Sequence, residues 1–78
     1  MKSHKEFKPT LAEIGQRIYK LRVLKNLTPK QIAPMISLTP EAYRNIEKGE
    51  SDPSVTTLLL ICKALNIDAR ELMKEVKA

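Results

Sequence analysis

The sequence has few of the residues on which most enzymes and metal proteins rely for chemistry. It contains one histidine, one cysteine and two glycines in 78 residues. A single cysteine cannot close an internal disulfide, and His4 has no second metal ligand near it. No clustered acid–base pair and no glycine-rich phosphate loop are present. We therefore predict a protein that is not an enzyme and that holds no metal or other cofactor.

Long apolar runs are also missing. No stretch of about 18 apolar residues occurs, so we expect no membrane-spanning segment. The first ten residues, MKSHKEFKPT, are basic but lack the apolar region of a secretory signal, and we expect a cytoplasmic protein. Cys62 lies in the apolar run LLLICKAL, which indicates a small core residue.

Acidic residues are scarce in the first part of the chain. Residues 1–30 carry eight Lys or Arg against two acids, whereas residues 31–78 carry six against seven. The net charge of +5 is therefore concentrated near the N-terminus, which suits binding to a polyanion such as nucleic acid. A charge that serves only solubility would give the same count. Because so short a chain makes one domain at most, we predict a flexible basic arm at 1–9 and a single domain at 10–78.

The apolar residues recur at helical spacing. No segment alternates strictly between apolar and polar residues, as a half-buried strand would. Five helices are predicted, at about 10–26, 29–36, 40–48, 54–66 and 69–76. The expected inward stripe of the first is Leu11, Ile14, Ile18, Leu21 and Leu24, and that of the fourth is Val55, Leu58, Ile61, Cys62 and Leu65. Gly15 interrupts the first helix, so we expect a neighbouring helix to approach closely there.

Two short helices with strong start signals lie between residues 27 and 49. Thr28 and Thr39 are each followed by a proline, a residue well suited to the first helical position, and each can cap its helix with its hydroxyl. Gly49 is expected to end the second helix in the left-handed conformation. Pro34 removes a hydrogen bond inside the first, which should therefore be short and bent.

This pattern of five helices, with a compact pair at positions two and three, resembles the phage-repressor/Cro type of helix-turn-helix domain (XRE-like, lambda-repressor-like). The similarity covers about residues 11–76 and rests on the segments IGQRIYKLRVLKNLT, LTPEAYRNIEKGESDPS and SVTTLLLICKALNI. It implies an all-α fold of five helices with the helix-turn-helix at the second and third. It also implies a bacterial or phage-type, nucleoid-associated transcriptional regulator, which binds a roughly palindromic site on double-stranded DNA as a homodimer.

The resemblance also assigns roles to matching positions. The recognition helix would span about 40–48. The positions that read DNA bases are Thr39, Pro40, Glu41, Arg44 and Asn45, and those that contact DNA phosphates are Arg22, Thr28, Lys30 and Lys48. An arginine late in the first helix of this family pairs with a glutamate late in the third, and the matching residues are Arg22 and Glu47.

Some positions depart from the family pattern. Ser37 occupies a turn position that is usually glycine. Pro40 has no donor, and phosphates would repel Glu41, which could read only a donor such as the cytosine amino group. Arg44 and Asn45 remain suited to guanine and adenine. The alternative is therefore a protein-binding module of the same fold, antitoxin-like or coactivator-like, with weak or no DNA binding.

The last two helices carry more apolar surface than a small domain can bury alone. We expect Leu60, Met73 and Val76 to form a dimer interface that sets the two recognition helices one DNA turn apart, about 34 Å. Because 78 residues leave no room for a sensor domain, no small-molecule effector is implied, and regulation would depend on concentration, dimerisation or a protein partner.

Overall fold

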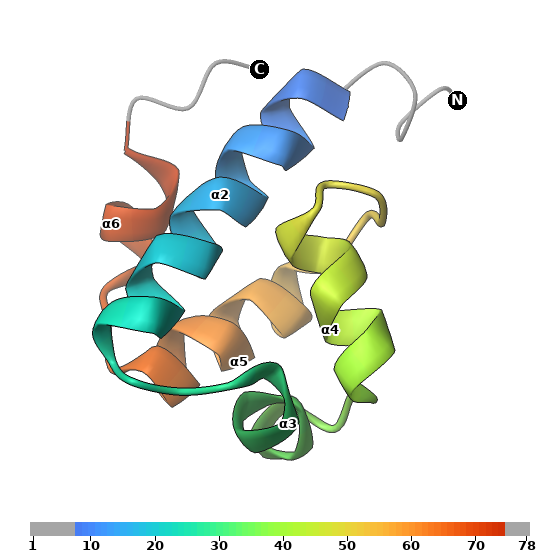
Figure 1. Ribbon diagram of the computed structural model, residues 1–78. Coiled ribbons are helices and arrows are strands. Elements are labelled where there is room, and N and C mark those ends of the chain that lie inside the picture. The colour runs from blue at the N-terminus through green and yellow to red at the C-terminus, as the bar shows by residue number, and fades with distance from the viewer. Residues whose placement is uncertain (1–7, 75–78) are drawn as a thin grey trace.

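The computed structural model describes residues 8–74 as a set of packed helices (Figure 1). The elements in chain order are α2 (Lys8–Leu24), α3 (Pro29–Ile32), the 3₁₀ helix η1 (Ala33–Ile36), α4 (Pro40–Glu47), α5 (Val55–Leu65) and α6 (Ala69–Met73). Residues 8–74 contain no strand. If α3 and η1 are counted as one bent helix, the result is the all-α arrangement of five helices that the sequence predicts.

The first helix starts earlier than predicted. Helix α2 already includes Lys8 and Pro9, so the predicted arm at 1–9 overlaps the helix by two residues. Proline is tolerated there because an N–H in the first turn has no helical partner to lose. The rest of the predicted arm, residues 1–7, lies outside the described residues.

Side-chain caps fix the starts of the two central helices. Thr28 Oγ1 accepts the Gln31 N–H at 3.2 Å, and the Gln31 side-chain oxygen accepts the Thr28 N–H at 2.8 Å. At α4, Thr39 Oγ1 accepts the Ala42 N–H at 3.1 Å. Each cap satisfies an amide that the first helical turn leaves without a partner. The predicted caps at Thr28 and Thr39 are therefore confirmed.

Pro34 shapes the corner between the two central helices. Helix α3 stops at Ile32, and the chain continues as the 3₁₀ turn η1, so the predicted short and bent helix is confirmed. Ser37 then adopts a φ of 59° and donates its N–H to the Pro34 carbonyl at 3.2 Å. Glycine would occupy this left-handed conformation with less strain. Gly49, which follows α4, adopts the predicted left-handed conformation with a φ of 73°.

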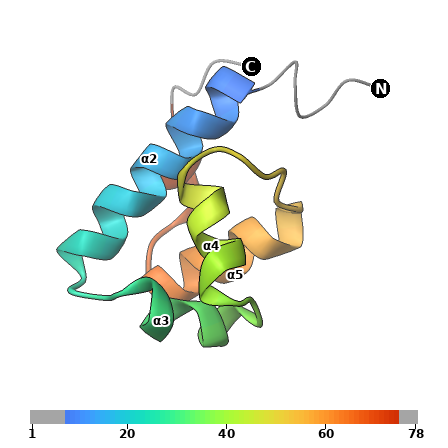
Figure 2. The same cartoon turned by 45° about the vertical axis from the view of Figure 1, so that its right-hand side comes forward.

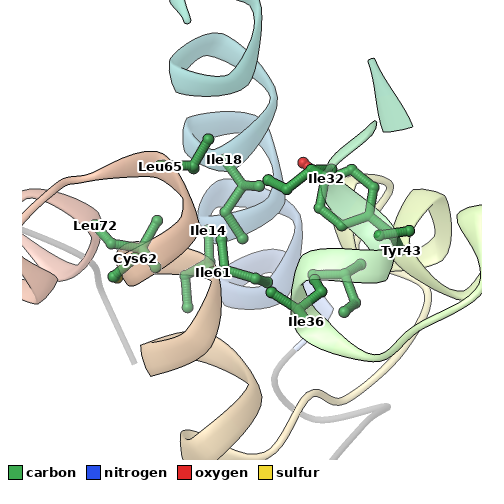
Figure 3. Close-up of a cluster of buried hydrophobic side chains, with 11 residues drawn as sticks. Ile14, Ile18, Ile32, Ile36, Tyr43, Ile61, Cys62, Leu65 and Leu72 are labelled. Atoms are coloured by element: carbon green, nitrogen blue, oxygen red, sulfur yellow. The ribbon is translucent and has the colours of Figure 1, made fainter. Parts of the chain in front are cut away.

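The core lies where α2, the α3–η1 pair, α4 and α5 meet (Figure 2), and α6 packs against α2 and α5 (Figure 1). Figure 3 draws this cluster as sticks and labels Ile14, Ile18, Ile32, Ile36, Tyr43, Ile61, Cys62, Leu65 and Leu72. Burial raises the pKa of the Cys62 thiol, which keeps it protonated and inert. The predicted place of Cys62 in the core is therefore confirmed.

Two residues predicted to face inward do not. Leu24 is 75% exposed and Val55 is 72% exposed. Each is a terminal residue of its helix. Helix α6 is also shorter than predicted, because Lys74 leaves helical geometry with a ψ of 126°. Val76, the end of the predicted helix, lies outside the described residues.

Helices α2 and α4 pack closely against each other around Gly15 of α2. A Cβ atom on Gly15 would lie 2.5 Å from the Ile46 carbonyl oxygen. One on Gly49 would lie 2.6 Å from Cα of Ala12, so both glycines serve the same crossing. The predicted reason for Gly15, close approach of a neighbouring helix, is confirmed.

Candidate nucleic-acid interface

An ion pair ties α4 to α2. Arg22 Nε donates to Glu47 Oε2 at 2.6 Å, and Arg22 Nη2 donates to Glu47 Oε1 at 3.2 Å. A third bond runs from Arg22 Nη1 to the Leu27 carbonyl at 2.7 Å, and the Tyr43 hydroxyl donates to Glu47 Oε2. The side chains of Arg22 and Glu47 are only 11% and 9% exposed. The structure thus places the expected pair together in a two-pronged geometry that fixes α4 relative to α2.

The same cluster shifts the acidity of its members. The hydrogen bond to Glu47 raises the pKa of Arg22 and keeps its guanidinium charged. Burial, with the hydrogen bond to Glu47, raises the pKa of Tyr43 far above its usual value. The Tyr43 ring is fully buried, so its hydroxyl stays neutral and continues to donate to the carboxylate.

Tyr43 should make stability depend on pH in the alkaline range. Its pKa is higher in the folded than in the unfolded chain, so its contribution is complete below about pH 10 and declines above it, where the unfolded chain loses the proton first. The free energy of unfolding should fall there by up to about 1.4 kcal/mol per pH unit more than in Tyr43→Phe. Urea unfolding of both proteins from pH 8 to pH 11 measures this difference, and parallel curves would contradict it.

The predicted base-reading residues lie on the exposed side of α4 or at its start. Glu41 and Arg44 are exposed, Asn45 is half-buried and Pro40 is the first helical residue. Asn45 lines a pocket between α4 and the segment that follows it, together with Leu38 and Ala42, whereas Arg44 lines a groove on the side of α2. Arg44 and Asn45 therefore line different pockets, as consecutive helical residues about 100° apart can. Thr39 caps the helix with its hydroxyl oxygen.

The predicted phosphate-binding residues fall into two groups. Thr28, Lys30 and Lys48 are exposed near the start of α3 and the end of α4. Arg22 is 9% exposed, and its guanidinium already makes three hydrogen bonds within the protein. We therefore correct its assignment, because geometry gives Arg22 a structural role instead of a phosphate contact.

Sequence reasoning missed two side chains of this surface. Gln16 and Tyr19 of α2 line the same groove as Arg44 and Lys48. The spacing of 16, 19 and 22 along one side of a helix could have identified them, because Arg22 was already expected to face α4. Between residues 8 and 74, no cluster of His, Cys, Asp or Glu side chains could hold a metal ion. No helix in that range has the length and apolarity needed to cross a membrane.

Comparison with known proteins supports the same family. A family model described as helix-turn-helix matches residues 18–72. An uncharacterized HTH-type transcriptional regulator of Rickettsia prowazekii is 44% identical over 57 residues, which are 70% of this chain and 44% of the relative. A second such regulator, from Rickettsia conorii, is 42% identical over 57 residues and 46% of its length is covered. The chain thus spans less than half the length of the curated relatives it matches.

Solved structures give the same result. The restriction-modification controller protein C.AhdI from Aeromonas hydrophila has 32% sequence identity and a TM-score of 0.77, covering 80% of this chain and 94% of that one. The clp gene regulator ClgR from C. glutamicum shares the fold with a TM-score of 0.81 at 21% identity, covering 86% of this chain and 87% of its own. The family match and the helical fold together show that this chain belongs to the phage-repressor/Cro type of helix-turn-helix family.

Proposed function

We propose that the protein is a sequence-specific DNA-binding transcriptional regulator, whose helix α4 enters the major groove. The observation that carries this proposal is that α4 is held in a fixed position relative to α2. The helix is capped at Thr39, and the Arg22–Glu47 pair fixes it to α2. Arg44 of α4 and Lys48, the residue that ends the helix, are exposed, and neither has an ionic partner among the described residues. A rigid helix that presents unpaired cations is suited to a groove lined by phosphates.

The exposed residues of α4 would each recognise a different DNA base. Arg44 would donate two hydrogen bonds to guanine, and Asn45 would pair with adenine. Glu41 would accept from a cytosine amino group, which is the one contact its charge allows. Thr39 and Pro40, at the start of the helix, would set how closely it approaches the bases. The proposed recognition surface is thus narrow in chemistry, with most of the specificity in Arg44 and Asn45.

Three exposed residues would contact phosphates without regard to sequence. Lys30 and Lys48 supply charge, and Thr28 supplies a hydroxyl at the start of α3. Each lysine contact releases a condensed counterion, which contributes about 0.9 to the slope of log affinity against log salt. The lysines therefore account for general affinity, whereas they cannot distinguish one sequence from another.

Binding to random duplex DNA, followed by selection of the bound sequences, tests this function. We expect affinity to fall steeply between about 50 and 200 mM salt and the selected pool to contain a roughly palindromic motif. Absence of binding at the lowest salt would contradict the proposal. That result would favour the alternative, a protein-binding module, for which the exposed Glu41 and the donorless Pro40 at the helix start are the supporting observation.

We infer that the protein binds DNA as a homodimer through α5 and α6. Leu59 is 53% exposed, Leu60 39% and Met73 45%, although a small domain gains stability by burying such side chains. Two-fold pairing of this surface would cover them and explain a palindromic site. Val76 would extend the interface, but it lies outside the described residues.

Leu60→Lys should convert the proposed dimer into a monomer, because a lysine charge cannot be buried at a two-fold contact without a partner. Sedimentation equilibrium across the micromolar range measures the change, and the monomer should bind a half-site weakly. Leu24→Lys is the matched control, since Leu24 is a more exposed leucine on a different helix. A wild-type protein that is monomeric at high micromolar concentration would contradict the dimer, and a dimeric Leu60→Lys would place its interface elsewhere.

A further inference from the structure

Arg17 connects α2 to α6, the last helix of the described chain. Its Nη1 donates to the Leu72 carbonyl oxygen at 3.2 Å, across 55 positions of sequence, and its Nη2 donates to Glu13 Oε2 at 3.0 Å. Glu13 lies one turn earlier on the same side of α2, so the ion pair holds the guanidinium in place. The Arg17 side chain is 26% exposed, and both bonds are therefore partly shielded from water.

The Leu72 carbonyl needs a partner from outside its own helix. Leu72 is the last residue but one of α6, and the carbonyls of a last turn have no donor within the helix. Arg17 also places a positive charge at the negative end of the helix dipole. A helix of five residues does not form on its own in water. The capping box of Asp68 and Glu71 fixes the start of α6, and Arg17 fixes its end.

The bond from Arg17 lies beside an open groove between α2 and α6. The groove has a volume of about 350 Å³ and is lined by Arg17, Lys20 and Leu21 from α2 and by Glu71 and Lys74. Open space on this side leaves the end of α6 without close side-chain packing. Within residues 8–74, Arg17 is the one groove residue whose side chain bonds α2 to α6.

Helix α2 lies between α4 and α6, and each of them packs against it (Figure 1). Arg22 bonds Glu47 of α4, whereas Arg17 bonds α6. Two residues five positions apart on a helix point about 140° away from each other, so the two arginines serve different sides of α2. Helix α2 is therefore a rigid link between the proposed recognition helix and the helix that carries Met73.

We propose that Arg17 is a positioning residue for the homodimer, because it fixes the end of α6 and with it the place of Met73 in the interface. The inference rests on the proposed function, and Arg17 acts through α6, with no contact of its own to DNA. Since α6 is fixed to α2 and α2 to α4, the pairing of two protomers sets the separation of their α4 helices. Arg17 thus contributes to the specificity for the spacing of two half-sites.

Arg17→Met tests the proposal, since it removes both hydrogen bonds and keeps most of the aliphatic part of the side chain. We expect the fraction of protomers with α6 in place to fall about threefold, and the dimer dissociation constant to rise about tenfold, because two such protomers must meet. Sedimentation equilibrium measures this constant. Arg17→Lys should recover most of the loss, because its ammonium can donate to the Leu72 carbonyl. Lys20→Met is the matched control, since it removes a charge from the same groove and should leave the constant unchanged.

Binding to DNA separates positioning from general support of the fold. Arg17→Met should bind a single half-site as the wild type does, because α4 and the Arg22–Glu47 pair are unchanged. Its preference for the selected palindrome over one with the half-sites moved apart by about two base pairs should fall by up to about tenfold, because this preference depends on pairing. Equal loss on the half-site and on the palindrome would overturn the proposal, since Arg17 would then support the domain as a whole.

The outcomes separate this inference from the proposed function. If the wild-type protein is a dimer and Arg17→Met has the same dimer dissociation constant, the inference is wrong and both the dimer and the proposed function stand. A monomeric wild-type protein would overturn the inference together with the dimer, whereas DNA binding by that monomer would still support a regulator. Because sedimentation requires no DNA, it decides the role of Arg17 even if the protein binds none.

Discussion

Glu47→Ala should lower the free energy of unfolding by about 3–5 kcal/mol, because it leaves the Arg22 charge without its partner in a largely buried site. The Arg22 side chain is 11% exposed, so water can solvate it only in part. The Tyr43 hydroxyl would lose its acceptor as well, and its ring is fully buried. Both groups would then carry unmet polar atoms between α2 and α4.

Urea unfolding of Glu47→Ala, followed by circular dichroism, measures this loss. Glu47→Gln should be less damaging, since its amide oxygen can still accept one bond from Arg22. The matched control is Glu50→Ala, a glutamate that is exposed just after α4, and it should change stability by less than about 0.5 kcal/mol. A Glu47→Ala protein as stable as the parent would show that the ion pair does not hold α4 in place.

Gly15→Ala should cost about 3 kcal/mol, although alanine is normally the better helix former by about 1 kcal/mol. The added Cβ would lie 2.5 Å from the Ile46 carbonyl oxygen and 2.7 Å from the Glu47 carbonyl carbon. Both atoms belong to backbone, so relief requires α2 and α4 to move apart, which would also stretch the Arg22–Glu47 pair.

Thermal and urea unfolding of Gly15→Ala test this expectation against Lys20→Ala, an exposed position on the same helix. The control should be neutral or slightly stabilising, because it improves helix propensity and removes no contact. If Gly15→Ala gained stability to the same extent, the close crossing would be able to relax, and the glycine would not be required.

Local signals predicted the parts of the fold that depend on local chemistry. The caps at Thr28 and Thr39 follow from the spacing of a hydroxyl, a proline and a free amide, which needs no knowledge of the rest of the chain. The bend at Pro34 follows from the missing N–H. The crossing at Gly15 could also be expected, because glycine inside a helix is costly unless it permits a contact.

Features that depend on the length and placement of neighbours were not predictable in this way. Periodicity alone assigned Leu24 and Val55 to the core, but whether a terminal residue is covered depends on how far another helix extends. The early start of α2 at Lys8 could not be predicted from local signals either, because Pro9 is compatible with both a flexible arm and the first turn of a helix.

The candidate site, too, has parts that the sequence predicts and parts that only the three-dimensional structure shows. The resemblance identified Arg22 and Glu47 by position, but only three-dimensional geometry shows that all three guanidinium nitrogens of Arg22 are engaged. The groove that joins Tyr19 and Gln16 to Arg44 arises from residues on two helices far apart in sequence. The joining of the two helices follows from tertiary packing, whereas the spacing of 16, 19 and 22 indicates only that these three residues share one side of α2.

The most direct test of the account is the affinity of Arg44→Ala for the selected site and for random duplex, measured side by side at one salt concentration. If α4 reads bases through Arg44, the variant should lose about 1–3 kcal/mol on the selected site and much less on random DNA, so its preference relaxes. Equal loss on both would contradict base reading by Arg44 and leave it as a phosphate contact only.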